Sequence, residues 1–451
     1  MKTSAIELTA ISILTFLYFI FYNYSLLINI YSPYTKFISL FVAIAFFFTL
    51  LPYARNLTKF NTINKKSIIP LIIISVYFIG VTVLKSDGKD IVRFLYTIFF
   101  IFLSYTIILL SINKIISINA LINSYIIAVV PHAIVGILAF ILVGSGLVDL
   151  SSWTFKFKDF FDQTAPFYGR TYSAPLLLSI IAKDQYATTL FGFQLYRIFA
   201  YSTESSVAAS LAMPAFFMSF RLPYPFRPLL VVLTMTYLLV IGSVGVLLVV
   251  GAVTVFWFIY NRSRRLAFFA GSSTVIAVVY LLFGLFSNKP VPLFQISILH
   301  LHIMPMRRVV AEGFQLFQNA GFFGHGYSAG LGPLLVRSFL DFGWIGLAIF
   351  VFIYTSILIK CLRLLQGEHR HIAYATIAIM LFQIFKGGKY DAFLNIFLML
   401  YVVLIRHDHG YTCLPRKWWP THNPLFNNSL PQYVIHHDDI NSNIDDATSS
   451  L

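Results

Sequence analysis

A glycine-rich stretch in the C-terminal third of the chain carries three side chains that could do chemistry, and it runs directly into a long apolar segment. The stretch is NAGFFGHGYSAGLGPLLVRSFLDFGWIGLAIFVF, residues 319–352, and the side chains are His325, Arg337 and Asp341. A histidine can act as acid or base near neutral pH, although between two glycines it is more often a turn residue. The glycines permit tight turns or close approach of the backbone to a ligand. Asp341 comes where the apolar segment begins, and because the dipole of a helix N-terminus favours a carboxylate, we favour a structural role for it.

The residues just before this stretch, RRVVAEGFQLFQN at 307–319, predict an amphipathic helix. Arg308, Glu312 and two amide side chains share one helical face, and three apolar residues share the opposite face. One interpretation is an interfacial helix whose arginines meet lipid phosphates. The other is that Arg308 and Arg307 bind an anionic ligand at the membrane surface. A guanidinium group matches phosphate oxygens two at a time, so a lipid that carries pyrophosphate would suit them.

A second candidate stretch is YRIFAYSTESSVAASLAM, residues 196–213. It places Arg197 and Glu204 just before an apolar segment, where the first could hold a phosphate and the second could deprotonate an alcohol. The alternative is that Glu204 belongs to an ordinary helix start, with Ser202 or Thr203 as the cap. The sequence has no CxxC, histidine cluster or aspartate pair with metal-ligand spacing, so it predicts neither a metal nor a cofactor.

The composition predicts that these stretches belong to an integral membrane protein. The 451 residues are 58% hydrophobic and 11% charged, whereas a soluble domain carries about a quarter charged residues. The mean hydropathy is +0.80. The apolar runs are continuous rather than alternating, which favours helices and excludes a β-barrel. The net charge of +15 does not indicate nucleic-acid binding, because the basic residues fall in short gaps between the apolar runs.

The sequence predicts an all-α fold with about twelve membrane-spanning helices. Their expected positions are 6–22, 37–53, 68–84, 94–112, 119–148, 204–220, 228–242, 243–260, 266–285, 342–360, 372–386 and 392–405. They make up a single membrane domain, residues 1–405, followed by a polar tail, 406–451, that we expect to be disordered. Cys361 and Cys413 then fall in cytoplasmic segments, so no disulfide framework is expected.

The basic gaps predict the orientation. They all follow even-numbered spans, so one assignment places every one of them, and both termini, in the cytoplasm. Two long connections are then outside: the first long segment, residues 149–203, and the second long segment, residues 286–341. Long connections are uncommon unless they have a function. Both are rich in aromatic and apolar residues, and we expect them to contain interfacial helices.

This arrangement resembles the O-antigen polymerase (Wzy-type) family and its relatives, the O-antigen ligases. Fifteen residues separate Arg308 from Gly324, and this R-x15-G spacing in the second long segment is similar to a polymerase motif. The sequence GHGYSAGLGPLLVRSFLDFGWIGL resembles the pattern that closes that loop. RIFAYSTESSVAASL resembles an Arg…Glu-Pro-Ser stretch, with Ser205 where proline is usual, and VIGSVGVLLVVG at 240–251 resembles the hairpin that follows.

Two departures from the family patterns bear on the choice of activity. Ligases carry His-Asn about nine residues before the acidic position, and this chain has Gly332-Pro333 there, which argues against a ligase. The first long segment lacks an R-x15-G from either Arg170 or Arg197. A scheme with one such motif in each long segment is therefore not expected.

The resemblance implies a polysaccharide polymerase in the bacterial inner membrane. Its substrate would be undecaprenyl-diphosphate-linked oligosaccharide, with membrane lipid and a chain-length regulator protein as further partners. It implies Arg308 as the main phosphate ligand, assisted by Arg307 and Arg197, and Glu204 or His325 as the base. The remaining substrate-binding residues are expected to be Gly324, Gly326, Arg337 and Asp341. The alternatives are a ligase and, from another class, a lipid-linked oligosaccharide flippase or other transporter. Transporters place ionisable groups deep in the membrane, and here only His132 is expected to be deep.

Overall fold

The structure is a computed structural model of the whole chain, which divides into two units, 1–405 and 406–451. All residues that it describes belong to the first unit. They are 44–45, 47–48, 50, 65–86, 88–112, 118–145, 147–148, 205–223, 225–241, 244–262, 321–327, 334–365, 367, 369–386 and 393–405, together with six short strands between 154 and 200. The predicted spans 6–22 and 266–285 lie outside the described residues, as does most of 37–53.

The described part of the chain contains nine helices, and each coincides with a predicted span. They are α4 (Lys65–Lys85), α5 (Gly88–Ile112), α6 (Ile118–Gly144), α7 (Ser205–Ser219), α8 (Phe226–Ile241), α9 (Val244–Arg262), α12 (Leu334–Leu364), α13 (Arg370–Lys386) and α14 (Phe393–Leu404). The fold class is therefore confirmed as helical for these segments. Two helical stretches, Leu121–Gly144 and Arg337–Leu364, are long and apolar enough to cross a membrane.

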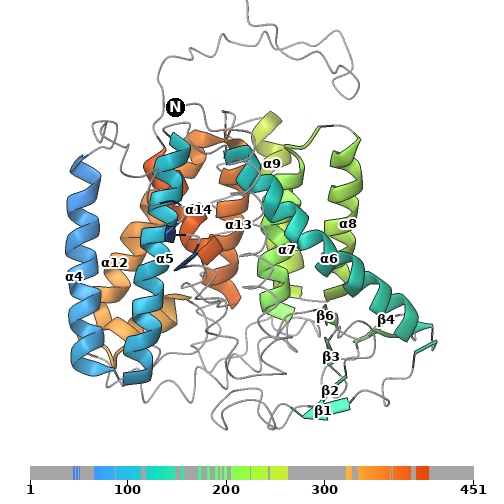
Figure 1. Ribbon diagram of the computed structural model, residues 1–451, viewed down its shortest axis with the longest axis horizontal. Coiled ribbons are helices and arrows are strands. Elements are labelled where there is room, and N and C mark those ends of the chain that lie inside the picture. The colour runs from blue at the N-terminus through green and yellow to red at the C-terminus, as the bar shows by residue number, and fades with distance from the viewer. Residues whose placement is uncertain are drawn as a thin grey trace, which may run out of the picture. The chain divides into compact units, whose positions relative to one another are not determined.

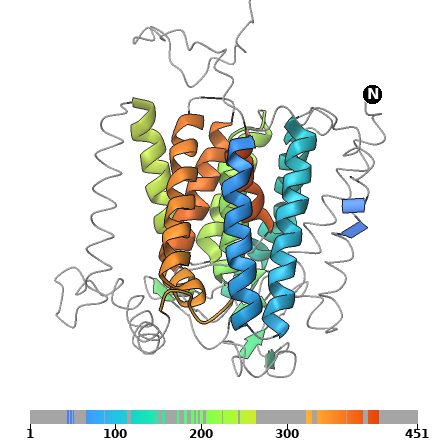
Figure 2. The ribbon, with the colours of Figure 1, turned by 90° about the vertical axis from the view of Figure 1, so that its left-hand side faces the viewer.

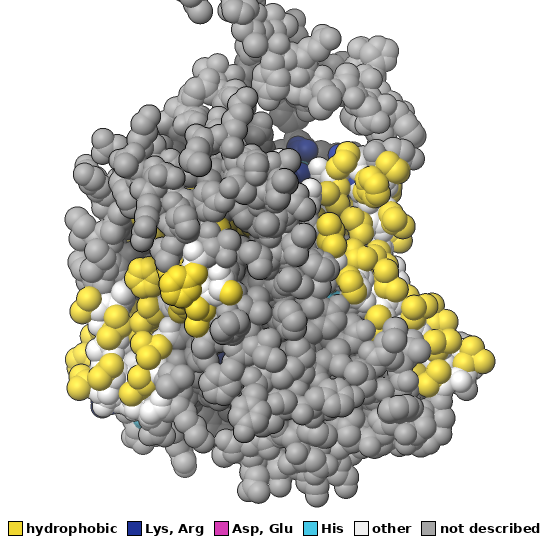
Figure 3. Space-filling view, viewed as in Figure 1, with side chains coloured by type: hydrophobic (Ala, Val, Ile, Leu, Met, Phe, Trp, Pro, Cys, Tyr) yellow, Lys and Arg dark blue, Asp and Glu magenta, His cyan; other side chains and the backbone are white. Residues whose placement is uncertain are grey.

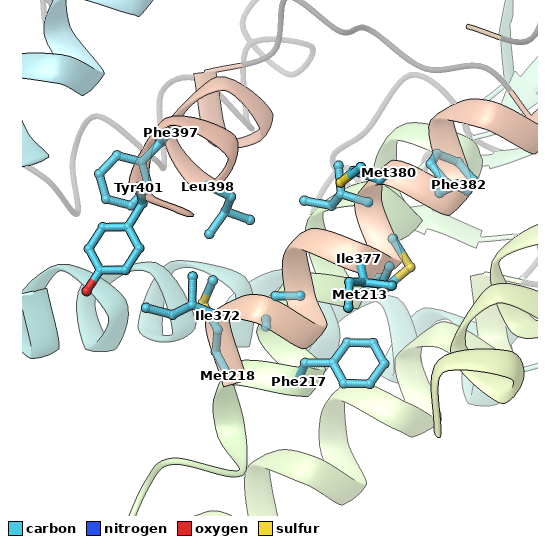
Figure 4. Packing of buried hydrophobic residues seen from close by; sticks show 14 of the residues in the cluster. Met213, Phe217, Met218, Ile372, Ile377, Met380, Phe382, Phe397, Leu398 and Tyr401 are labelled. Carbon is cyan, nitrogen blue, oxygen red and sulfur yellow. The ribbon is translucent and has the colours of Figure 1, made fainter. Parts of the chain in front are cut away.

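The helices pack side by side around α13 (Figures 1 and 2). Helix α13 contacts α7, α9, α12 and α14, while α14 contacts α5, and α8 contacts α6 and α7. Every residue from 371 to 380 is buried, so α13 is enclosed on all sides. Figure 4 shows the core between these helices. Its labelled side chains are Met213, Phe217 and Met218 from α7, Ile372, Ile377, Met380 and Phe382 from α13, and Phe397, Leu398 and Tyr401 from α14.

The outward faces of the outer helices carry large apolar side chains that remain exposed. On α8, for example, Leu229 and Val232 are 65% and 63% exposed, and on α12 Phe352 is 63% exposed. Figure 3 shows such side chains in a patch at the left of the molecule and in a band along its right-hand side, where α8 and α6 lie in Figure 1. An exposed apolar surface of this extent calls for an apolar environment or a partner to cover it.

The first long segment contains strands where interfacial helices were expected. These are β1 (Thr154–Lys156), β2 (Thr171–Ser173), β3 (Ile180–Ala182), β4 (Thr188–Leu190), β5 (Phe193–Leu195) and β6 (Ile198–Ala200). Antiparallel pairing gives one sheet in the order β1-β2-β3-β6 and a β4-β5 hairpin. The prediction was wrong for these residues, because Thr, Tyr, Phe and Ile in short runs favour strands over helices. Strand β6 contacts α6, α7 and α8, which ties the sheet to the helices.

Helix α12 begins earlier than the sequence predicted. Its first residue is Leu334, directly after Pro333, whereas the predicted span began at residue 342. Proline just before a helix is compatible with the helix start. The helix in fact continues through this region with an interruption at Gly343, which has φ 68° and ψ −162°.

Candidate functional site

The interruption of α12 at Gly343 is the feature that organises the site. A residue with φ of 68° cannot continue a right-handed helix, so Gly343 divides α12 into a short first part and a long second part. Such a division leaves carbonyl groups without a helical partner on one side and N–H groups without one on the other. Inside an apolar bundle each of these groups needs another partner, because an unpaired buried peptide group is costly.

Residues 321–327, the glycine segment, supply those partners. The N–H groups of His325 and Gly326 donate to the carbonyls of Leu340 and Asp341, at 2.8 and 3.0 Å. In the other direction, the N–H groups of Trp344 and Ile345 donate to the carbonyls of residues 321 and 322, at 3.2 and 3.4 Å. The glycine segment therefore closes the break from both sides.

A tyrosine from another helix completes the closure. The Tyr77 hydroxyl on α4 donates to the Phe342 carbonyl at 2.7 Å. Phe342 is also buried against Phe78 on the same helix, with ring centroids 4.5 Å apart. The break is therefore held by main-chain and side-chain contacts together, and it is not an open gap in the helix.

Glycine is required at the points where the two backbones meet. A Cβ on Gly343, which has φ 68°, would lie 2.3 Å from the main chain of Phe322, and one on Gly324, with φ 70°, would lie 2.5 Å from the main chain of Asp341. On Gly326, with φ 110°, it would lie 2.6 Å from the Ser86 hydroxyl oxygen. These distances are well inside van der Waals contact. The role that the structure gives to Gly324 and Gly326 is thus close backbone packing.

The glycine segment is also tied to the connection between α4 and α5. The N–H of Tyr327 donates to the Ser86 hydroxyl at 2.7 Å. The buried Tyr327 hydroxyl lies 3.2 Å from the Thr97 hydroxyl, and its ring packs edge-on against Phe94 at 5.3 Å. The sequence analysis did not single out Tyr77, Ser86, Thr97 or Tyr327. No local pattern could have found them, because their partners lie more than 200 residues away in the chain.

Arg337 and Asp341 form an ion pair one helical turn apart. The Arg337 Nε lies 3.5 Å from Asp341 Oδ2, and the two side chains are 16% and 0% exposed. The prediction that Asp341 sits at a helix N-terminus was wrong, since α12 begins seven positions earlier at Leu334. Asp341 is instead close to the C-terminal end of the first part of α12, where the helix dipole disfavours a carboxylate. Arg337 offsets that cost and compensates the buried charge.

Aromatic side chains surround the exposed side of this region. Phe322 and Phe323 are 68% and 54% exposed, and Trp344 is 53% exposed with its ring packed edge-on against Phe339. His325 lies beside them and is partly exposed. Exposed aromatic rings next to a polar turn are typical of the boundary between a bilayer and water.

The structure thus brings together five of the residues singled out in the sequence: Gly324, His325, Gly326, Arg337 and Asp341. The other four, Arg197, Glu204, Arg307 and Arg308, lie outside the described residues. Arg197 directly precedes β6 and Glu204 directly precedes α7, both elements being described. Within the described residues, no group of three or more His, Cys, Asp or Glu side chains could hold a metal ion.

No family model matches the chain, and no curated protein matches it either.

Proposed function

We propose that the chain is a polysaccharide polymerase that joins lipid-diphosphate-linked oligosaccharide units at a membrane surface. The observation that carries the proposal is the closed break in α12. It fixes residues 321–327 of the second long segment against the bundle, and Arg307 and Arg308 precede this fixed segment by 14 and 13 positions in the chain. An enzyme whose substrate is carried by a lipid needs its phosphate ligands close to the membrane surface. The exposed apolar faces of the helices and the aromatic residues around His325 support a membrane setting.

In the proposed reaction, a sugar hydroxyl on one lipid-linked unit attacks the anomeric carbon at the end of the growing chain. The new carbon–oxygen bond forms while the bond between that carbon and the lipid diphosphate breaks. The hydroxyl proton goes to Glu204 or His325. The diphosphate leaves with the bonding electrons, and Arg308, with Arg307 and Arg197, would stabilise the charge that develops on it.

The broken helix also favours a transporter, because transporters bind substrates at interrupted helices. In those proteins the freed backbone groups face the substrate. Here the carbonyls of residues 340–342 and the N–H groups of residues 344 and 345 are hydrogen-bonded to the glycine segment and Tyr77. A substrate would have to displace that segment before it could use them, so we place the transporter second. A ligase would use the same chemistry with another acceptor.

The state of the lipid-linked saccharide in cells lacking the protein distinguishes the three activities. Single repeat units attached to the final acceptor, and never longer chains, are the outcome expected for a polymerase. Full-length polymer stranded on the lipid carrier would mean a ligase, and single units trapped on the cytoplasmic face would mean a flippase. Either of the last two outcomes would overturn the proposal.

Variants then test the assigned roles in the same strain. Arg308→Ala should reproduce the loss of polymerisation at a normal protein level, whereas Arg363→Ala, an exposed arginine in the last turn of α12, should not. For the base, His325→Ala and His325→Asn should both lower the rate about 100-fold or more if His325 takes the proton. Full activity of His325→Asn with loss in His325→Ala would instead give His325 a hydrogen-bonding role and leave Glu204 as the base.

A further inference from the structure

The end of the bundle away from the glycine segment carries a cluster of positive charge. Its three arginines are Arg221, in the connection between α7 and α8, Arg227, the second residue of α8, and Arg370, the first residue of α13. The buried His371 lies among them: Arg370 Nε is 3.3 Å from His371 Nε2. Besides burial, the charges of Arg370, Arg221 and Arg227 all lower the pKa of His371, so all three are close to it. We call these four residues the arginine cluster.

The helix dipoles make this cluster more positive still. Helix α8 begins at Phe226 and α13 begins at Arg370, so two helix N-termini meet the cluster, and neither helix has an acidic residue in its first turn. Cations are disfavoured at helix N-termini, where anions are favoured. Arg227 and Arg370 therefore occupy the positions at which their charge costs most. Figure 3 shows Lys and Arg side chains at the upper end of α8, beyond its exposed apolar face.

Two polar groups beside the cluster lack a partner within the described part of the chain. The Nη1 of Arg221 is buried and donates no hydrogen bond there, and the hydroxyl of Tyr374, a residue that is 2% exposed, has no hydrogen-bond partner there either. Tyr374 lies one turn after Arg370 on α13, on the same helical face. A buried donor without a partner costs free energy comparable to a lost hydrogen bond. A ligand with several acceptor oxygens would satisfy both groups.

We propose that the arginine cluster binds a phosphate group. Guanidinium groups pair with phosphate oxygens two at a time, and helix N-termini add N–H donors and a favourable dipole. The other cations nearby do not share these features. Arg363 is exposed in the last turn of α12, a C-terminal position that suits a cation, and the Lys360 ammonium donates to the Val403 carbonyl. The inference does not depend on the proposed polymerase activity.

The phosphate could belong to an anionic phospholipid headgroup or to a soluble phosphorylated molecule, and one set of measurements separates the two. The purified full-length protein is delipidated in detergent, and its thermal unfolding midpoint is measured with added phosphatidylglycerol, phosphatidylcholine or inorganic phosphate. Stabilisation by phosphatidylglycerol alone would identify a headgroup site. Stabilisation by inorganic phosphate with no preference between the two lipids would identify a site for a soluble phosphate. No stabilisation by either phosphatidylglycerol or inorganic phosphate would overturn the proposal.

Matched variants locate the effect. Arg221→Gln and Arg370→Gln should each weaken the apparent affinity for the effective probe about tenfold or more, the size expected for one charge-assisted hydrogen bond. Arg363→Gln removes the same charge from the same end of the bundle and should leave the affinity unchanged. An equal loss in all three variants would show a diffuse attraction of the surface and would contradict a site. Arg221→Lys, which keeps the charge, serves if Arg221→Gln does not fold, and it should bind more weakly than the native protein.

Discussion

The two ends of the helical unit use arginine in different ways. Near the glycine segment, Arg337 is mostly buried and paired with Asp341 on the same helix, and the surrounding backbone groups are hydrogen-bonded to one another. At the other end, Arg221, Arg227 and Arg370 are gathered around His371 at two helix N-termini. In the first arrangement, the charged groups and the backbone groups at the break find their partners within the protein. The second concentrates charge of one sign, which creates a local positive potential that attracts anions.

The comparison predicts that the end with the glycine segment is fixed by steric fit. Gly343→Ala should lower the free energy of unfolding by about 3–4 kcal/mol, because the new methyl group adds backbone strain and meets the Phe322 main chain at 2.3 Å. The thermal unfolding midpoint of the purified protein measures it. Gly251→Ala on α9 is the matched control: its Cβ meets nothing within 4 Å, and it should be neutral or slightly stabilising. Equal midpoints for the two variants would contradict the tight contact.

The ion pair at the same end gives the next largest effect. Arg337→Met and Asp341→Leu should each cost about 3 kcal/mol, because each leaves a largely buried charge without its partner. The double variant should be more stable than either single variant, since it leaves neither charge. Thermal unfolding of all four proteins measures the coupling. Additive losses would show that the two charges act independently, and the contrast between the two ends would then be smaller than we describe.

The arginine cluster makes a smaller and pH-dependent prediction. Burial and the charges of Arg370, Arg221 and Arg227 lower the pKa of His371 to about 3, and His371 precedes the predicted span 372–386. Because the unfolded histidine, with a pKa near 6.5, binds a proton that the folded one does not, stability should fall as the pH drops below 6.5. The fall between pH 7 and pH 5 should be about 2 kcal/mol.

The His371→Gln variant is the control for this prediction, because it should lack that part of the pH dependence while other groups titrate as before. Bound phosphate would sharpen the comparison further. An anion at the cluster offsets the arginine charges and so raises the pKa of His371 toward its ordinary value. Because bound phosphate then reduces the loss of stability at acid pH, the stability profiles measured with and without phosphate should diverge as the pH falls, and a constant difference between them would separate His371 from the cluster.

Much of the helical architecture could be predicted from the sequence. The continuous apolar runs located the nine helices that the structure describes, several with ends within two residues of those observed, such as α7 and α14. The glycine-rich stretch also drew attention to the region where α12 is interrupted. What could not be predicted was the structural role of its glycines. A glycine before an apolar run indicates a turn, a ligand contact or a close packing contact equally well, and the partner that decides among these is distant in the chain.

Two predictions failed for related reasons. Asp341 was expected at a helix start because it lies at the outer end of the apolar run, yet α12 begins earlier and Gly343 interrupts it without ending it, a result that depends on the tertiary contacts of residues 321–327. The first long segment was expected to contain interfacial helices, but the six short runs of it that the structure describes pair as strands. Strand pairing is non-local, so a single stretch of sequence could not establish it.

The bond between Tyr327 and Ser86 has a consequence for biosynthesis. The two residues are 241 positions apart in the chain. At about 5–20 residues per second, a ribosome needs roughly 10–50 s to reach the second after making the first. During that time the α4–α5 hairpin exists without the segment that will cover its turn. Assembly of this corner is therefore late, and any shortened chain that stops before Tyr327 leaves the turn of the hairpin without this contact.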